Sequence, residues 1–210
     1  MDDYLSDDEQ WDRLKRWLKE NGPWALAGVA IAALAVAGWR WWGEHREQAL
    51  LAAAADYQAL FTTFTRNDLA AAEKQADALV AAHPGTGYAD QAELAVARLE
   101  IENGQAAAAA TRLARVMQKS ADPALALAAR LRLARVQLDQ GQADAALATL
   151  GAAEAGAFAP RFAEVKGDAL LAKGDRAGAL AAYREARAAG TSVDTDLLDL
   201  KINDLTRSGS

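Results

Sequence analysis

Residues 131–150 read LRLARVQLDQGQADAALATL and contain one complete helical-hairpin pattern centred on Gly141. Good helix formers lie on both sides of this glycine, which can adopt the left-handed backbone conformation that ends a helix. Ala146, five positions later, is small enough to let two helices pack closely, and Leu138, three positions earlier, should fill the gap between neighbouring hairpins. The stretch therefore predicts two antiparallel helices joined at Gly141.

The same pattern recurs across residues 44–207. Its turn residues, spaced 37, 37 and 33 positions apart, are Asn67, Gly104, Gly141 and Gly174. The small residues that follow five positions later are Ala72, Ala109, Ala146 and Ala179, and the large residues three positions before the turns are Phe64, Ile101, Leu138 and Leu171. A period near 34 residues is typical of tetratricopeptide repeats, in which hairpins stack because one alone cannot bury its apolar face.

The repeats are degenerate. The position early in the first helix, where a large aromatic is typical, holds Asp56, Glu93, Arg130 and Ala163. Residues 193–207 depart from the repeat altogether, and their apolar face consists of Leu197, Leu198, Ile202 and Leu205. We expect this segment to be a capping helix that closes the solenoid, followed by a disordered tail at 208–210.

Composition supports an all-α fold and excludes several functions. Apolar residues make up 52% of the chain, many of them alanine, and the chain has no cysteine and a net charge of −6. Disulfides, thiolate metal sites and cysteine nucleophiles are thereby excluded, and no basic patch favours nucleic acid. His45 and His83 share no ligand-spaced or catalytic motif, so we expect no enzyme activity, metal or cofactor.

A transmembrane helix is predicted at 23–43. Residues 24–42 read WALAGVAIAALAVAGWRWW, and their single charge is Arg40. Nineteen residues in a helix span about 28 Å, close to the hydrocarbon thickness of a bilayer. Tryptophans at both ends suit the two headgroup layers. The alternatives are a buried helix of a soluble protein and a signal peptide cleaved after Ala37, although a leader with seven acidic residues is atypical of signal peptides.

The distribution of positive charge predicts the orientation of this helix. Its N-terminal flank carries Arg13, Lys15, Arg16 and Lys19, whereas its C-terminal flank carries Arg40 and Arg46. The more basic flank stays in the cytoplasm. We therefore expect a cytoplasmic acidic leader at 1–22, either a solvated disordered tail or a partner-binding segment, and a periplasmic repeat domain at 44–207.

One face of the predicted membrane helix is lined by small residues, Gly28, Ala32 and Ala35. Spacing of four and three places them on the same side, where a second helix could approach closely. The alternative is that small residues occur there because alanine is abundant throughout the chain.

Three segments resemble the YfgM family. They are LRLARVQLDQGQADAALATL at 131–150, GDALLAKGDRAGALAAY at 167–183 and LKINDL at 200–205. The order of acidic leader, basic cluster and apolar helix is similar as well. The resemblance implies an ancillary subunit of the SecYEG translocon, anchored in the inner membrane of a Gram-negative bacterium. It also implies a PpiD-like periplasmic chaperone as partner and exported proteins as clients. The alternatives are a membrane-tethered envelope scaffold or regulator with an unrelated partner, and an enzyme accessory.

The repeat pattern also predicts a partner-binding surface on the first helix of each hairpin. Its eight candidate residues are Arg98, Ile101, Leu131, Arg135, Leu138, Arg161, Asp168 and Leu171. Mixed arginine and leucine would suit short extended segments with acidic and apolar side chains. The alternative is that these arginines are solvated or paired within their own helices. Arg112, on a second helix, serves as the comparison position outside this surface.

Overall fold

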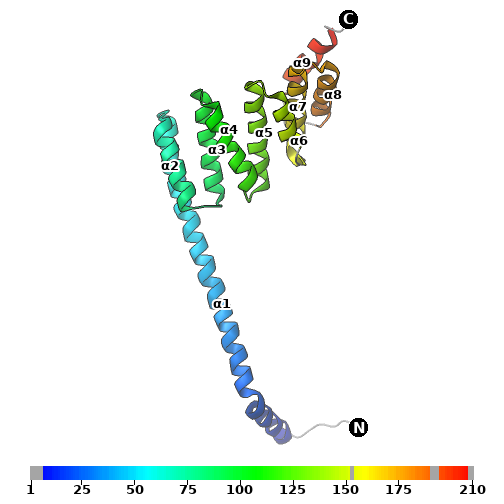
Figure 1. Cartoon of the computed structure of the whole chain (residues 1–210). Helices are drawn as coiled ribbons and strands as arrows, with labels where there is room; N and C mark the ends of the chain where they lie inside the picture. Colours follow the sequence, from blue (N-terminus) through cyan, green and yellow to red (C-terminus); the bar gives the residue numbers. More distant parts are fainter. Residues whose placement is uncertain (1–6, 152–153, 190–193, 208–210) are drawn as a thin grey trace, which may run out of the picture. The chain divides into compact units, whose positions relative to one another are not determined.

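The structure is a computed structural model that describes residues 7–151, 154–189 and 194–207, and these residues form helices and no strand. The helices are α1 (Asp7–Thr65), α2 (Leu69–Ala82), α3 (Gly87–Glu102), α4 (Ala106–Lys119), α5 (Pro123–Asp139), α6 (Ala143–Gly151), the 3₁₀ turn η1 (Gly156–Phe158), α7 (Ala159–Ala172), α8 (Arg176–Ala188) and α9 (Thr195–Arg207). The predicted all-α class is confirmed (Figure 1).

The chain divides into two compact units, Met1–Ala49 and Leu50–Ser210. In the first, α1 begins at Asp7, so the described part of the leader is helical, and both readings of the leader stay predictions. The helix continues without a break through the apolar stretch, in which 18 residues have a mean hydropathy of 1.6. Its large side chains are exposed, Leu26 by 73% and Trp39 by 81%. Length and composition would allow this helix to cross a bilayer.

The second unit begins with the end of α1 and is built from hairpins whose turns lie where the sequence predicts them. The backbone φ is +54° at Asn67, +77° at Gly104, +75° at Gly141 and +83° at Gly174. The residue after each turn donates its N–H to the carbonyl five positions earlier, as Gln142 does to Gln137. This bond closes the last turn of the helix, which is why the left-handed residue is needed.

Of the four large residues three positions before the turns, Phe64 and Leu138 pack against the hydrophobic core as we expected, but Ile101 and Leu171 do not. Ile101 is 40% exposed and Leu171 36% exposed, while Phe64 and Leu138 are half-buried. At all four positions the carbonyl of this residue accepts the N–H of the turn residue, as Leu138 does from Gly141. The position lies in the last turn of its helix, where the side chain reaches the edge of the stack.

Four hydrophobic clusters hold the second unit together, and each joins three consecutive helices. The first cluster lies between α1, α2 and α3, the second between α3, α4 and α5, the third between α5, α6 and α7, and the fourth between α7, α8 and α9. The predicted packing alanines Ala72, Ala109, Ala146 and Ala179 have no exposed surface. Close packing at these alanines is what lets each hairpin share its apolar face with the next.

The helix α9 closes the stack, which confirms the predicted capping helix. Leu198 and Leu205 are buried in the fourth cluster, and Ile202 packs at its edge. Leu197, which the sequence assigned to the same apolar face, is 44% exposed. Val193 and residues 208–210 lie outside the described residues.

Candidate protein-binding site

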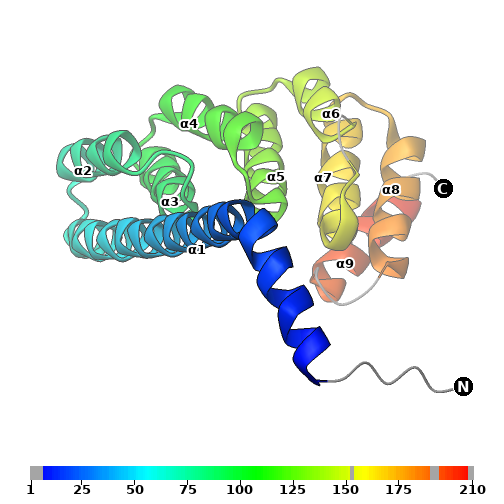
Figure 2. The ribbon, with the colours of Figure 1, turned by 90° about the horizontal axis from the view of Figure 1, so that it is seen from below.

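The first helices of the hairpins form one continuous surface, which we call the odd-helix wall. It comprises the exposed side of α1 from Leu50 onward and of α3, α5 and α7. Helix α3 packs against α5, and α5 against α7. Figure 2 shows α3, α5 and α7 along one side of the stack and α2, α4 and α6 along the other.

Most of the predicted binding residues are accessible on this wall. Arg98, Ile101, Arg135, Arg161 and Leu171 are exposed, and Leu138 and Asp168 are half-buried. Their role in binding stays a prediction. The helix-packing role of the small-residue face in the first unit also stays a prediction. Gly28, Ala32 and Ala35 are exposed, and a Cβ added at Gly28 would meet nothing within 4 Å.

Leu131 was wrongly assigned to the binding surface. It is only 3% exposed and belongs to the third cluster with Leu150 and Phe162. It precedes the buried Ala134 by three positions, and residues three apart share a helix face, so both point into the core. A partner cannot reach this side chain in the folded domain.

Asp168 is held by internal contacts. Its Oδ1 accepts the Tyr183 hydroxyl at 2.7 Å and the Lys201 ammonium at 2.8 Å. Burial raises the pKa of Tyr183, and the Asp168 carboxylate raises it further. The Lys201 Nζ also lies 5.3 Å from the centre of the Tyr183 ring and 3.2 Å from Glu164 Oε1. These contacts tie α9 to α7 and α8, so Asp168 fixes the capping helix.

Arginines from two neighbouring helices gather on the wall. Arg98 of α3 pairs with Glu102 at 2.7 Å, whereas Arg135 of α5 has no acidic partner among the described residues. Arg132 of α5 donates weakly to the Leu94 carbonyl of α3 at 3.4 Å. Desolvation lowers the pKa of Arg132, and the positive charges of Arg98 and Arg135 lower it further. The three guanidinium groups thus make a region of positive potential that Glu102 only partly neutralises.

An aromatic pocket opens next to these arginines, and the sequence interpretation missed it. Its lining residues are Tyr57, Phe61, Phe64, Thr65, Asn67, Ala95, Arg98, Leu99 and Glu102. Phe61 is 59% exposed, and its ring meets Phe64 edge-on with centroids 6.4 Å apart. Tyr57, Phe61 and Phe64 recur at spacings of four and three, so they share one helix face. That spacing was the signal available in the sequence.

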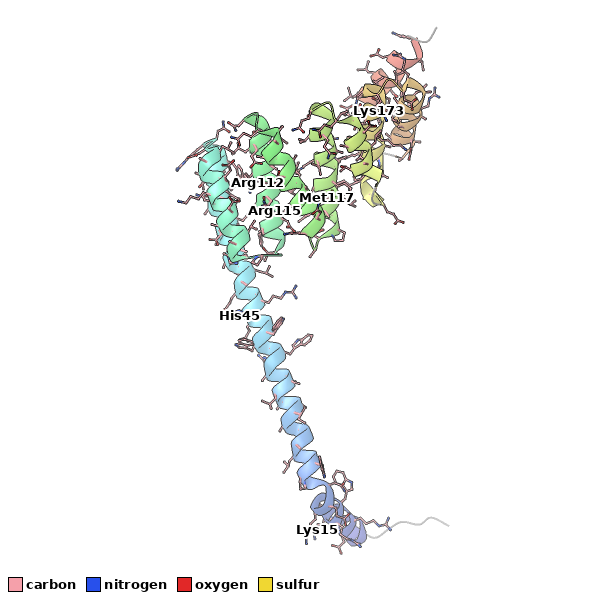
Figure 3. The ribbon with its side chains drawn as sticks, in the orientation of Figure 1. Lys15, His45, Arg112, Arg115, Met117 and Lys173 are labelled. Carbon is pink, nitrogen blue, oxygen red and sulfur yellow. The ribbon has the colours of Figure 1, made fainter. Side chains whose placement is uncertain are left out.

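Arg112 lies in a buried ion-pair network outside the wall. Its guanidinium contacts Glu100 at 2.7 Å, Asp77 at 2.8 Å and Glu93 at 2.9 Å. Burial raises the pKa of Glu100 despite its contact with Arg112. The network joins α2, α3 and α4, and Figure 3 marks Arg112 together with Arg115, which also binds Glu93. Because Arg112 is buried, it cannot serve as the exposed comparison position that we expected.

The described residues contain no group of three or more His, Asp or Glu side chains that could hold a metal ion. The side chains that the odd-helix wall exposes include aromatic rings, aliphatic groups and guanidinium groups. Such a surface can bind apolar and acidic side chains of another protein.

Comparison with known proteins identifies the family. Residues 15–207 match the model of a tetratricopeptide repeat-like domain. A protein of Escherichia coli (strain K12), named ancillary SecYEG translocon subunit, is 32% identical over 214 residues, covering 98% of this chain and 100% of its own. A protein of the same name from Haemophilus influenzae is 30% identical over 201 residues, covering 96% of this chain and 98% of its own.

A third protein of that name, from Aggregatibacter actinomycetemcomitans, is 29% identical over 201 residues, covering 96% of this chain and 98% of its own. No solved structure matches the chain significantly. The similarity to these relatives extends over almost the whole chain, including both the apolar helix and the repeats. The chain therefore belongs to the tetratricopeptide repeat-like family that includes the ancillary SecYEG translocon subunits.

Proposed function

We propose that this protein is a non-enzymatic adaptor of the SecYEG translocon, anchored in the inner membrane by α1. The observation that supports this most strongly is the nearly full-length similarity to relatives that carry the name ancillary SecYEG translocon subunit. The exposed apolar stretch of α1 suits a bilayer-spanning anchor, because its side chains lack any protein covering among the described residues.

In this proposal the N-terminus is cytoplasmic and the repeat domain lies in the periplasm. The basis is the excess of Lys and Arg on the N-terminal flank of the membrane helix, four against two on its C-terminal flank. The domain would then meet proteins as they leave the translocon and pass them to a PpiD-like periplasmic chaperone. The odd-helix wall, with exposed Phe61 and Arg135, supplies a surface suited to unfolded segments.

The topology is tested by fusing alkaline phosphatase after Arg207, since this enzyme is active only when exported. We expect active phosphatase, and no signal from a cytoplasmic reporter at the same position. The reverse pattern would overturn the orientation.

Association with the translocon is tested by photocrosslinking in inner membranes. A photoreactive amino acid replaces Phe61 or Arg135 on the wall, and as a matched control it replaces Gln118, an exposed residue of α4. We expect SecYEG subunits, the chaperone or exported chains at the wall positions and fewer products at Gln118. Repeated capture of an unrelated envelope protein would favour the scaffold or regulator, and equal products at all positions would reject the wall as the docking surface.

A further inference from the structure

The aromatic pocket and the arginines beside it define the chemistry of a ligand more narrowly than the proposed function does. We propose that they bind an extended peptide segment that inserts an apolar, preferably aromatic, side chain into the pocket and places a carboxylate against Arg132 and Arg135. This inference rests on the proposed adaptor function and specifies which segments of a client the wall selects.

The pocket supplies the apolar half of the site. Phe61 stays 59% exposed although Tyr57 and Phe64, on the same face, pack against the first hydrophobic cluster. An aromatic ring inserted here can meet Phe61 and Phe64 edge-on or with an offset, both favourable geometries for ring pairs. Burying such a ring also removes the exposed face of Phe61 from water.

The arginine cluster supplies the charged half. Arg132 Nη1 lies 3.4 Å from the carbonyl of Leu94, one helical turn before Arg98 on α3, and Arg135 follows Arg132 by one turn on α5. The three guanidinium groups therefore share one stretch of the wall, where Glu102 compensates only Arg98, and their like charges repel one another, which also lowers the pKa of Arg132. A ligand carboxylate would relieve this repulsion and could form a two-pronged contact with a guanidinium group. Charge complementarity therefore favours an acidic segment over a basic one.

The pocket also contains a group suited to the backbone of a peptide. Asn67, held at φ +54° by the end of α1, lines the pocket and has no side-chain partner among the described residues. Its amide can donate to a peptide carbonyl and accept from a peptide N–H. The aromatic rings and the amide of this lining suit an apolar side chain and a peptide backbone, which a lipid headgroup does not offer.

The distance between the pocket and the arginines sets the approximate spacing between the aromatic residue and the acidic residue of the peptide. The pocket lies between α1 and α3, whereas Arg132 and Arg135 belong to the adjacent α5. Packed helices are about 8–10 Å apart, and an extended chain advances about 3.3 Å per residue. The carboxylate should therefore follow or precede the aromatic residue by about three positions.

The test measures fluorescence anisotropy of labelled peptides with the full-length protein in phosphatidylcholine nanodiscs. The probe is a twelve-residue peptide of Gly, Ser and Gln that carries one Phe and, three positions away, two Glu. Companion peptides replace the Phe with Ala or both Glu with Lys. We expect the first probe to bind and each companion to bind about tenfold more weakly or not at all, the effect typical of losing a charged contact.

Variants assign the binding to this site. Phe61→Ala removes the exposed ring, and Arg135→Glu should weaken the Glu peptide about tenfold while improving the Lys peptide. Arg184→Glu is the matched control, because Arg184 is an exposed arginine of α8 and its replacement changes the net charge equally. Unchanged melting temperatures show that each variant is folded.

Three results would overturn the inference: no binding of any probe, equal weakening by Arg135→Glu and Arg184→Glu, or loss of the peptide when phosphatidylglycerol vesicles compete for Arg135. The last result would identify an anionic lipid surface as the occupant instead. If the protein still crosslinks to SecYEG in membranes, these outcomes reject the peptide site alone and leave the adaptor function intact.

Discussion

Two arginines on consecutive helices have opposite surroundings. Arg112 of α4 is 9% exposed and contacts three carboxylates from α2 and α3. Arg135 of α5 is exposed, has no acidic partner among the described residues and repels its neighbour Arg132. Burial and pairing make the first a structural residue, and exposure without pairing makes the second available to a ligand. The charge alone therefore does not indicate the role.

Removing the buried arginine should have the largest effect. Arg112→Ala leaves Glu100 buried without its cationic partner. It also removes one of the two arginines that contact Glu93, which keeps only Arg115. Breaking a buried ion pair from one side costs about 3–5 kcal/mol. We expect the free energy of unfolding in urea to fall by that amount, with Arg135→Ala as the matched control. If both variants unfold at the same urea concentration, the contrast between the two arginines is wrong.

Enlarging the packing alanines tests the same buried side of the hairpins without changing a charge. Ala146 and Ala179 have no exposed surface and lie where two helices cross. Replacing either with Leu should lower the free energy of unfolding by about 1–3 kcal/mol through overpacking. Thermal melting monitored by circular dichroism measures the change. Exposed Ala181 of α8 provides the control, since Ala181→Leu adds the same volume where there is room.

The left-handed turn at Gly141 ends α5, the helix that carries Arg135 on the odd-helix wall. Its φ is +75°, a region in which a β-branched residue is strained. Gly141→Val should destabilise the domain by at least about 1 kcal/mol. Gly151, in α6 without a positive φ, is the comparison position for the same substitution. Equal melting temperatures of the parent and Gly141→Val would contradict a strained turn.

The fold could be predicted further than the site because its signals are periodic. In each hairpin a left-handed turn residue is followed five positions later by a buried small residue, as at Gly104, Gly141 and Gly174, because every hairpin must pack its two helices in the same way. Exposure at the helix ends depends on tertiary contacts instead. Ile101 and Leu171 were expected both to fill the gaps between hairpins and to lie on the partner-binding surface, and the structure leaves them exposed.

The site depends on contacts between residues far apart in the sequence, which spacing does not reveal. Arg112 meets Asp77 across 35 positions, and Lys201 meets Asp168 across 33, so neither pairing follows from the repeat pattern. The core position of Leu131 and the aromatic face at Tyr57 and Phe61 do follow from helical spacing. Helical spacing alone therefore predicts both of these features.

The smallest expected effect on stability is that of Arg135→Ala. The side chain is exposed and unpaired, so its loss removes no hydrogen bond, and the repulsion that it exerts on Arg132 disappears. Exposed charges typically contribute less than about 1 kcal/mol. We expect the free energy of unfolding to stay within about 0.5 kcal/mol of the parent, or to rise slightly, at low ionic strength.

The same variant sharpens the comparison with Arg112 because stability and binding should separate. Arg135→Ala should weaken binding of the Phe- and Glu-containing peptide while its urea midpoint stays unchanged. Raising the salt concentration should weaken peptide binding to the parent more than binding to the variant, since one of the screened charges is absent. A marked loss of stability in Arg135→Ala would mean that this arginine, like Arg112, holds the fold together, and the odd-helix wall would then lose its charged contact for a ligand.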